Sequence, residues 1–310
     1  MSPGLAGGVR AVAGKAEEES VLVARVTTTT QPGADPGDAR LPGLMNRALS
    51  PTFRDRLAAR QRPLIGGWVC SGSPVVAEIM AGSGLDWVLI DMEHAPNGLE
   101  SVLAQLYAIS GYPQVTPVVR VPVGEAVVIK QVLDLGAQNL LVPMVSTPAQ
   151  ALEVARAAQY PPDGIRGVGS ALARSARWNR VDGYLAHAAS HVSVVVQIET
   201  AEGVGNAAAI AATPGIDGVL VGPSDLAASL GLLGQQTHAD VVDAVNQVFE
   251  RVASVGKPVG VNAFDPAAAR GYMADGAAFV LVGADVALLA RASEQLARDF
   301  SKNPGGRDGE

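Results

Sequence analysis

The sequence predicts a (β/α)8 barrel, also called a TIM barrel, and three observations lead to this fold class. Short runs rich in β-branched residues alternate with stretches whose apolar residues recur at spacings of three and four. Eight such units fit within the 310 residues of the chain, and about 250 residues are typical of one barrel. Hydrophobic residues make up 48% of the chain, which is enough for a large core. Strands that alternate with helices form a parallel sheet, and eight of them can close on themselves.

The expected strands are short, and turn signals or helical patterns separate them. They lie near residues 64–69, 87–91, 116–121, 139–143, 192–198, 217–221, 258–262 and 279–282. Residues 127–133 and 241–248 are clear examples of the helical pattern between them. An open doubly wound sheet is the alternative fold. It would need a glycine fingerprint after the first strand, whereas Gly66 and Gly67 begin that strand.

One large domain with a tail at each end is the expected organisation. Residues 45–302 are expected to form the barrel. Residues 1–44 are rich in Gly, Ala, Pro and Thr without a sustained period, so we expect a flexible N-terminal tail with no assigned function. Residues 303–310 are expected to form a short flexible C-terminal tail. The segment 160–191 is long for a connection and follows the fourth strand, so we expect it over the mouth of the barrel.

Charge and composition argue against several classes of partner. The net charge is −7 and no basic block is present, so nucleic acid is not an expected partner. No apolar run reaches the roughly 18 residues that a membrane span needs, and the start of the chain lacks the continuous apolar segment of a secretory signal. The single cysteine, Cys70, excludes an internal disulfide and fits a reducing compartment. We therefore expect a cytoplasmic protein.

Polar side chains stand where several of the expected strands end, which is where barrel enzymes keep their catalytic residues. These residues are Asp91, His94, Arg120, Gln197, Glu199 and Asp225. Gln197 and Glu199 are two positions apart and so point to the same side of their strand. Because the carboxyl ends of all strands meet at one mouth, we expect these side chains to form a single site.

The residue types at this mouth favour a metal site with an acid–base group. Two carboxylates on separate strand ends, Glu199 and Asp225, suit one hard divalent cation, although either alone would more often cap or begin a helix. His94 would act as a general base, since a carboxylate partner such as Asp91 orients an imidazole and raises its basicity. Arg120 suits a carboxylate or an enolate oxygen, and its structural alternative is a salt bridge with a neighbouring strand-end carboxylate.

Missing residue types narrow the reaction class. The four lysines are Lys15, Lys130, Lys257 and Lys302, and none is expected at the mouth, so imine chemistry is not expected. The chain contains no Gly-x-Ser-x-Gly elbow and no Walker-type loop. Carbon-acid chemistry with a metal as electrophile is the class that these residues favour.

Five motifs resemble those of the HpcH/HpaI aldolase family, and the resemblance runs from about Ala48 to Phe300. They read LIDMEHAPN, LVPM, YPPDGIRGVG, QIE and GPSD, and they occupy residues 89–97, 141–144, 160–169, 197–199 and 222–225. The resemblance implies a (β/α)8 barrel of the phosphoenolpyruvate/pyruvate type. It also implies a class II aldolase, which depends on a divalent metal cation and forms pyruvate.

The resemblance also implies roles for individual residues. Glu199 and Asp225 match the metal ligands, and the cation would be Mg²⁺, Mn²⁺ or Co²⁺. His94 matches the acid/base histidine, with Asp91 as its partner. The residues that would contact the keto acid are Arg120, Gln197, Ser224 (through its backbone) and Asp225. Asn262 departs from the aliphatic residue that relatives tend to carry in strand seven, which bears on aldehyde preference rather than on the core chemistry.

The activity implied is cleavage of 4-hydroxy-2-oxo acids, such as 4-hydroxy-2-oxoheptanedioate, to pyruvate and an aldehyde such as succinate semialdehyde, in the breakdown of aromatic compounds. Aldolases of 2-keto-3-deoxy or 5-keto-4-deoxy sugar acids would share the same residues and remain an alternative. Another enolate-forming lyase of this barrel family, such as a CoA-thioester lyase or a decarboxylating cyclase, is a further alternative. A non-catalytic keto-acid-binding protein is the alternative from a different class.

The apolar surface of the last expected helix indicates that the chain forms an oligomer. Residues 286–297 are apolar around more of the helix than the roughly 100° stripe of an ordinary surface helix. The resemblance implies a homo-hexamer, built as a trimer of dimers, in which partners exchange this last helix. The other expected partners are a small-molecule keto acid and an aldehyde, without nucleic acid or membrane.

Overall fold

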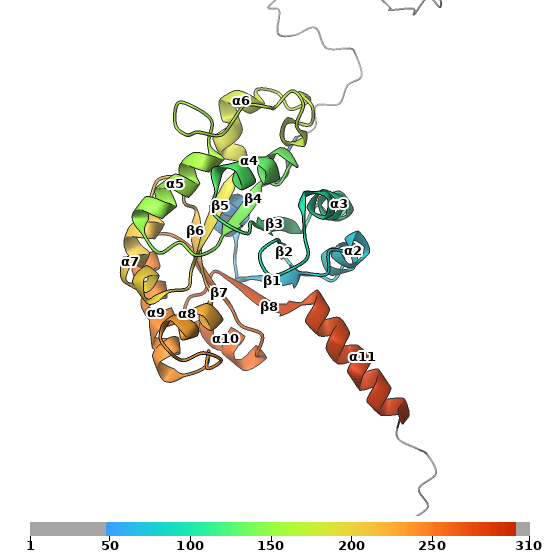
Figure 1. Ribbon diagram of the computed structural model, residues 1–310, viewed down its shortest axis with the longest axis vertical. Helices are drawn as coiled ribbons and strands as arrows, with labels where there is room; N and C mark the ends of the chain where they lie inside the picture. Colours follow the sequence, from blue (N-terminus) through green and yellow to red (C-terminus); the bar gives the residue numbers. More distant parts are fainter. Residues whose placement is uncertain (1–47, 302–310) are drawn as a thin grey trace, which may run out of the picture. The chain divides into compact units, whose positions relative to one another are not determined.

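The computed structural model describes residues 48–301, and these residues form a closed parallel barrel (Figure 1). The strands follow one another around the barrel in chain order, and the last pairs with the first. They are β1 (Leu64–Val69), β2 (Trp87–Asp91), β3 (Thr116–Arg120), β4 (Asn139–Val142), β5 (Ser193–Ile198), β6 (Gly218–Val221), β7 (Val259–Asn262) and β8 (Phe279–Ala284). The predicted fold class and the eight predicted strands are confirmed.

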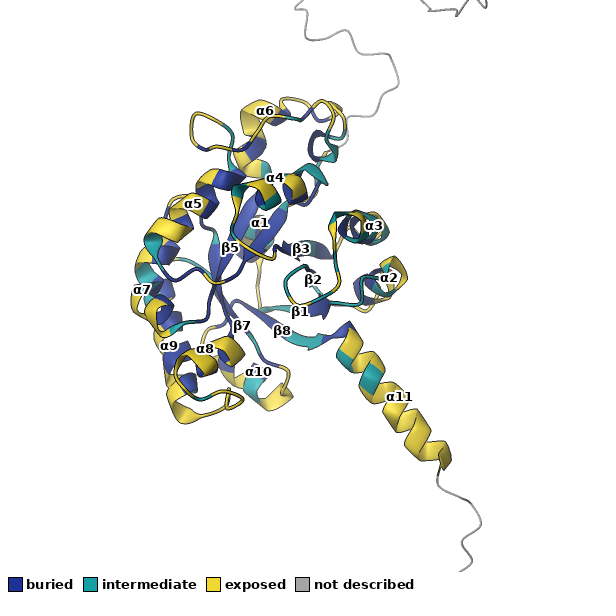
Figure 2. Cartoon of the chain, viewed as in Figure 1, coloured by how far each residue is buried: buried dark blue, intermediate teal, exposed yellow. Residues whose placement is uncertain are grey.

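Helices cover the outside of the barrel and turn their buried faces toward the strands (Figure 2). The α-helices of the described part are α1 (Phe53–Ala59), α2 (Pro74–Ala81), α3 (Leu99–Ile109), α4 (Ala126–Asp134), α5 (Pro148–Ala158), α6 (Tyr184–His187), α7 (Ala201–Ala212), α8 (Pro223–Ser229), α9 (Ala239–Ser254), α10 (Pro266–Ala274) and α11 (Asp285–Ser301). Two short 3-10 helices, η1 (Arg174–Ala176) and η2 (Ala188–His191), precede β5.

Side-chain caps explain several helix starts. Ser73, Thr147 and Asp265 each accept an N–H of the first turn, and a proline follows each of them at the first helical position.

Aromatic side chains fill the inside of the barrel at its amino-terminal end. Phe53 of α1 packs on Trp87 and Phe279, with ring centroids 5.0 and 5.3 Å apart. Gly66 and Gly260 are required beside these rings, because a Cβ at Gly66 would overlap the indole of Trp87 and one at Gly260 would overlap the ring of Phe279. This layer closes one end of the barrel, so a ligand can enter only from the other end.

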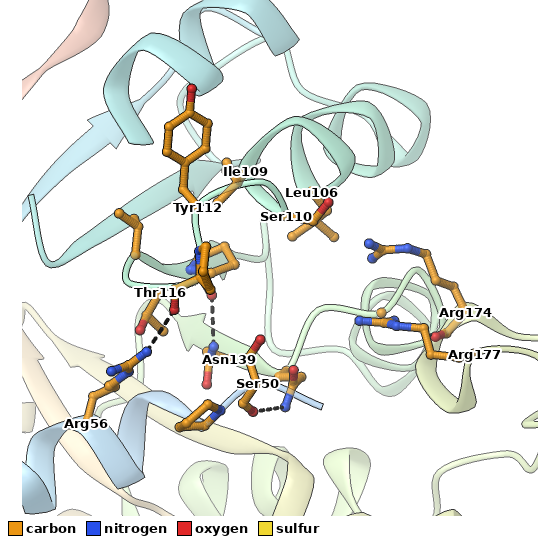
Figure 3. A pocket seen from close by; sticks show the side chains of 16 residues that line it. Ser50, Arg56, Leu106, Ile109, Ser110, Tyr112, Thr116, Asn139, Arg174 and Arg177 are labelled. Carbon is orange, nitrogen blue, oxygen red and sulfur yellow. Dashed lines mark hydrogen bonds between the residues drawn. The ribbon is translucent and has the colours of Figure 1, made fainter. Parts of the chain in front are cut away.

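The segment 160–191 lies at the closed, amino-terminal end, so the prediction that it covers the mouth is wrong. Arg174 donates to the carbonyl of Leu135 just after α4, and Arg174 and Arg177 share a pocket with Asn139, the first residue of β4 (Figure 3). The reason is topological: α5 stands between β4 and this segment, so the segment leads from a helix into β5. Only connections that directly follow a strand lie at the mouth.

The motif at 160–169 contributes to the fold of this segment. Arg166 is buried, its Nη2 donates to Asp134 Oδ1 at 2.8 Å, and its guanidinium lies 4.6 Å from the ring centre of Tyr160. A buried arginine needs such partners because an unpaired buried charge is costly. The motif therefore anchors 160–191 to α4 rather than supplying a catalytic group.

Helix α11 extends away from the barrel at the end of β8 (Figure 1). Of its 17 residues only Asp285 is buried. Leu289, Leu296 and Phe300 are 67%, 61% and 83% exposed. Packing on its own barrel therefore does not stabilise most of this helix.

The predicted domain boundaries at 44/45 and 302/303, and both predicted tails, lie outside the described residues and stay predictions. Within residues 48–301 no helix is long and apolar enough to span a membrane.

Candidate active site

One open cavity of about 310 Å³ lies at the mouth of the barrel, a size in the range of small-molecule sites. Every strand except β4 contributes a lining side chain. The residues expected from the sequence that line it are Asp91, His94, Arg120, Gln197, Ser224 and Asp225. Glu199 is buried next to Gln197, to which it is hydrogen-bonded. The fold thus brings all the predicted site residues together, while their roles remain predictions.

Two donors hold the carboxylate of Glu199. Its Oε1 accepts the backbone N–H of Met144 at 2.7 Å, and its Oε2 accepts from Nε2 of Gln197 at 2.5 Å. Burial is the largest cause that raises the pKa of Glu199 to about 7, and the carboxylates of Asp225 and Glu93 act in the same direction, whereas the N–H of Met144 lowers the pKa. A buried carboxylate with like-charged neighbours is stabilised by a bound cation.

Asp225 belongs to the first turn of α8, directly after β6. Its negative charge is one of the causes that raise the pKa of Glu199, so the two carboxylates belong to the same part of the mouth. The described residues contain no group of three or more His, Cys, Asp or Glu side chains arranged around a metal position. Two carboxylates nevertheless fit a divalent cation, because they balance its charge and leave oxygen positions for a ligand and water.

Arg120 is buried and is held by two carboxylates and an aromatic ring. Its Nε and Nη2 donate to the two oxygens of Asp91 at 2.7 and 2.8 Å. Its Nη1 lies 2.8 Å from Oε2 of Glu93, and its guanidinium carbon lies 4.3 Å from the ring centre of Trp68. These partners fix the plane of the guanidinium. The hydrogen bonds to Asp91 use one N–H on Nε and one on Nη2, and the other N–H groups can serve the ion pair with Glu93 or a ligand in the cavity.

The predicted pair of Asp91 with His94 is not formed in this structure. Asp91 is buried, and besides Arg120 its oxygens accept the backbone N–H groups of Glu93 and His94. The imidazole is instead 66% exposed, and Oε1 of Glu93 lies 3.9 Å from its Nε2, too far for a hydrogen bond. The physical reason is that Asp91 ends the strand facing inward, whereas His94 lies three residues further on, in the turn above it. Asp91 therefore positions the guanidinium of Arg120 and the backbone of Glu93 and His94.

The sequence analysis missed Trp68, which lines the cavity, and Asp285, which holds the end of β1 beside it. The indole Nε1 of Trp68 donates to Oδ1 of Asn262 at 2.8 Å, so β1 and β7 are joined across the cavity wall. Asp285 accepts the backbone N–H groups of Cys70 and Ser71 at 2.8 and 3.0 Å, which ties the end of β1 to the start of α11. An aromatic residue near the end of β1 was a usable signal for Trp68. Nothing local to Asp285 revealed its partner, which lies 215 residues away in the sequence.

Comparisons with known proteins agree with this fold and confirm the family expected from the motifs. The sequence profile of the HpcH/HpaI aldolase/citrate lyase family matches residues 64–292. A hydroxypyruvate/pyruvate aldolase of Deinococcus radiodurans is 53% identical over 252 residues, which cover 81% of this chain and 90% of the relative. A 4-hydroxy-2-oxo-heptane-1,7-dioate aldolase of Salmonella dublin is 48% identical over 259 residues, or 83% of this chain and 98% of the relative. The crystal structure of a family protein from Burkholderia cenocepacia J2315 matches with a TM-score of 0.76 and 43% identity, covering 79% of this chain and 97% of that chain.

Gly222→Ala should weaken metal binding without removing either carboxylate. The added Cβ would lie 2.7 Å from Nε2 of Gln197 and 2.9 Å from Oε2 of Glu199, so the carboxylate has to move. We expect the Kd for Mn²⁺, measured by titration, to rise about 10- to 100-fold, as when a group that supports a ligand is lost. Gly271→Ala is the control, because a Cβ there meets nothing within 4 Å. An unchanged Kd for Mn²⁺ in Gly222→Ala would show that Glu199 is not a metal ligand.

Proposed function

This chain belongs to the HpcH/HpaI aldolase/citrate lyase family, and on that basis we propose that it is a class II, divalent-metal-dependent aldolase of 4-hydroxy-2-oxo acids. As a carbon–carbon lyase it would break the C3–C4 bond and release pyruvate and an aldehyde. The substrate we propose is 4-hydroxy-2-oxoheptanedioate, which would give succinate semialdehyde. The observation that supports this reading most directly is the joint placement of Glu199, Asp225 and Arg120 at one barrel mouth.

Glu199 and Asp225 would hold the divalent cation, which we propose to be Mg²⁺, Mn²⁺ or Co²⁺. When bound, such a cation supplies Lewis acidity that draws electrons toward the oxygen atoms of a keto acid. The protein's own contribution includes a carboxylate, that of Glu199, which Met144 and Gln197 already orient. Preorganisation of this kind avoids rearrangement when the reaction occurs.

His94 would take the proton from the C4 hydroxyl of the substrate. Its exposed ring lines the cavity, where it can reach a bound molecule. As the C3–C4 bond breaks, its electrons pass to C3 and to the C2 oxygen, and Arg120 would donate to that negative charge. Gln197 and the backbone around Ser224 would contact the keto acid, and a proton added at C3 gives pyruvate.

A second candidate is aldol addition with hydroxypyruvate or pyruvate as the donor. Two relatives named hydroxypyruvate/pyruvate aldolase, from Deinococcus radiodurans and Pseudomonas aeruginosa, are 53% and 47% identical to this chain. Sugar-acid aldolases would use the same residues and differ only in the aldehyde pocket. A screen of aldehyde acceptors with both keto acids would separate these substrates.

A cytoplasmic location remains a prediction from the single cysteine.

Removal of the metal should abolish aldol cleavage. EDTA should stop the reaction, and added Mn²⁺, Co²⁺ or Mg²⁺ should restore it. Glu199→Gln and Asp225→Asn each remove one charged ligand, so we expect losses of metal affinity and turnover beyond the roughly 10- to 100-fold typical of residues that only support a ligand. Glu202→Gln on the exposed face of α7 is the matched control. Full activity of either ligand variant at low metal concentration would exclude the metal assignment.

His94→Ala should slow aldol cleavage by roughly 10² to 10⁴, the usual contribution of a general base. The affinity for Mn²⁺ should stay unchanged, because His94 is not a proposed ligand. His187→Ala removes another exposed histidine, far from the mouth, and should leave the rate unchanged. A drop in Mn²⁺ affinity in His94→Ala would identify His94 as a metal ligand. An unchanged rate of aldol cleavage would show that His94 is not the general base.

We propose that the chain forms a homo-hexamer, a trimer of dimers in which α11 packs on a neighbouring barrel. The support is the apolar surface of α11, which residues 48–301 leave exposed. Leu289→Glu places a charge on that surface, so we expect smaller assemblies by light scattering at micromolar concentration, together with lower activity. Leu233→Glu is the matched control, since Leu233 is a leucine that is 81% exposed elsewhere. A wild-type chain that is a fully active monomer would refute the proposal.

A further inference from the structure

A small pocket at the closed end of the barrel is lined by Arg56, Arg174 and Arg177, and by no acidic side chain of residues 48–301. Thr116 and Asn139, the first residues of β3 and β4, place it at the amino-terminal end, opposite the mouth. Its volume is about 100 Å³, whereas pockets for cofactors and drug-sized molecules begin at roughly 300 Å³. The space therefore suits a few water molecules or one small ion.

Two of these arginines bring their charges close together. Arg174 and Arg177 extend from the segment 160–191 into the pocket (Figure 3). A Cβ at Gly136 would lie 2.7 Å from Nη1 of Arg174 and 2.8 Å from Nη1 of Arg177, so both guanidinium groups flank the same point. Neighbouring like charges repel each other, and an anion beside them offsets that repulsion.

Neither Arg56 nor Arg174 pairs with a carboxylate among residues 48–301. Arg56 donates from Nη2 to the carbonyl of Pro113 at 2.9 Å. Arg174 donates from Nη1 to the carbonyl of Leu135 at 3.0 Å, and its guanidinium carbon lies 4.5 Å from the ring centre of Tyr107. Burial lowers the pKa of Arg174, which shows that its charge is partly removed from water without an acid to balance it.

The Nε of Arg56 is a buried donor that has no hydrogen-bond partner within residues 48–301. Native proteins pair almost all buried polar groups, and the missing partner of an N–H has to be an acceptor. The acidic residues that neighbour the lining residues in the sequence are engaged elsewhere, since Asp55 bonds Thr52 and Asp134 bonds Arg166. Because Arg56 lines the pocket, an anion held there can supply the acceptor.

We propose that this arginine pocket binds a small oxyanion, with inorganic phosphate as its ligand. Guanidinium groups match the oxygen atoms of phosphate and of carboxylates. Phosphate carries more charge and more acceptor oxygens than a simple carboxylate such as acetate, so it can bond guanidinium groups from several directions. Bound there, it joins α1, which carries Arg56, to the segment 160–191, which carries the other two arginines. The pocket lies opposite the mouth, so this inference does not depend on the proposed aldolase function.

Calorimetric titration of the full-length protein with sodium phosphate at constant ionic strength tests this inference. We expect saturable binding with one phosphate per chain, and binding of acetate that is weaker by at least about 10-fold. Phosphate should also raise the Tm, because it binds the folded chain and not the unfolded one. Arg56→Gln and Arg174→Gln should each weaken phosphate binding about 10- to 100-fold, as expected when one charge-assisted hydrogen bond is lost.

Arg62→Gln and Arg180→Gln are the matched controls, because both arginines are exposed and neither lines the pocket. Both controls should keep the wild-type Kd for phosphate. The Tm of each variant without phosphate shows whether it folds, and Arg56→Gln decides the outcome if Arg174→Gln does not fold.

Three results would overturn the inference. The first is a wild-type chain that shows no saturable phosphate binding, and the second is acetate that binds as tightly as phosphate. The third is a folded Arg56→Gln or Arg174→Gln variant with the wild-type Kd, which would place the phosphate elsewhere, for example at the mouth. None of these results bears on the proposed aldolase function, which is tested by residues of the mouth.

Discussion

The mouth of this barrel depends on the buried pair of Asp91 and Arg120. The two residues are direct neighbours across the parallel ladder of β2 and β3, and the fork of the arginine meets both carboxylate oxygens. Loss of one partner from such a pair costs about 3–5 kcal/mol, since the other charge stays buried. Asp91 also accepts the N–H groups of the next turn, so the same pair places Glu93 and His94 at the mouth.

Charge balance explains what this mouth can bind. Four carboxylates, those of Asp91, Glu93, Glu199 and Asp225, stand at the strand ends, and Arg120 is already shared by the first two. Burial raises the pKa of Glu93, and burial with its neighbours raises that of Glu199 to about 7. A divalent cation relieves this excess of negative charge, and an anionic keto acid can then enter beside it. The same imbalance makes a purely anionic ligand without a cation unfavourable here.

One end of the barrel is closed and the other carries the cavity, because the two ends are packed differently. Phe53, Trp87 and Phe279 close the amino-terminal end with rings that need glycine neighbours. At the other end polar side chains gather in an open cavity, where the ring of Trp68 packs against Arg120. The segment 160–191 packs against the closed end, and within residues 48–301 the mouth is open to solvent. Helix α11 begins at that mouth through Asp285 and then departs from its own barrel.

The sequence by itself determined the barrel and the identity of the clustered side chains. Alternation of strand and helix periods is a local property, and the ends of parallel strands must meet at one mouth, so residues such as Arg120, Glu199 and Asp225 could be grouped in advance. Contacts at the mouth were decided by tertiary structure. Asp91 pairs with Arg120 rather than with His94, and Met144, with a φ of 56°, turns its N–H toward Glu199. Such contacts depend on side-chain direction and backbone geometry across distant segments, which no local pattern of residues encodes.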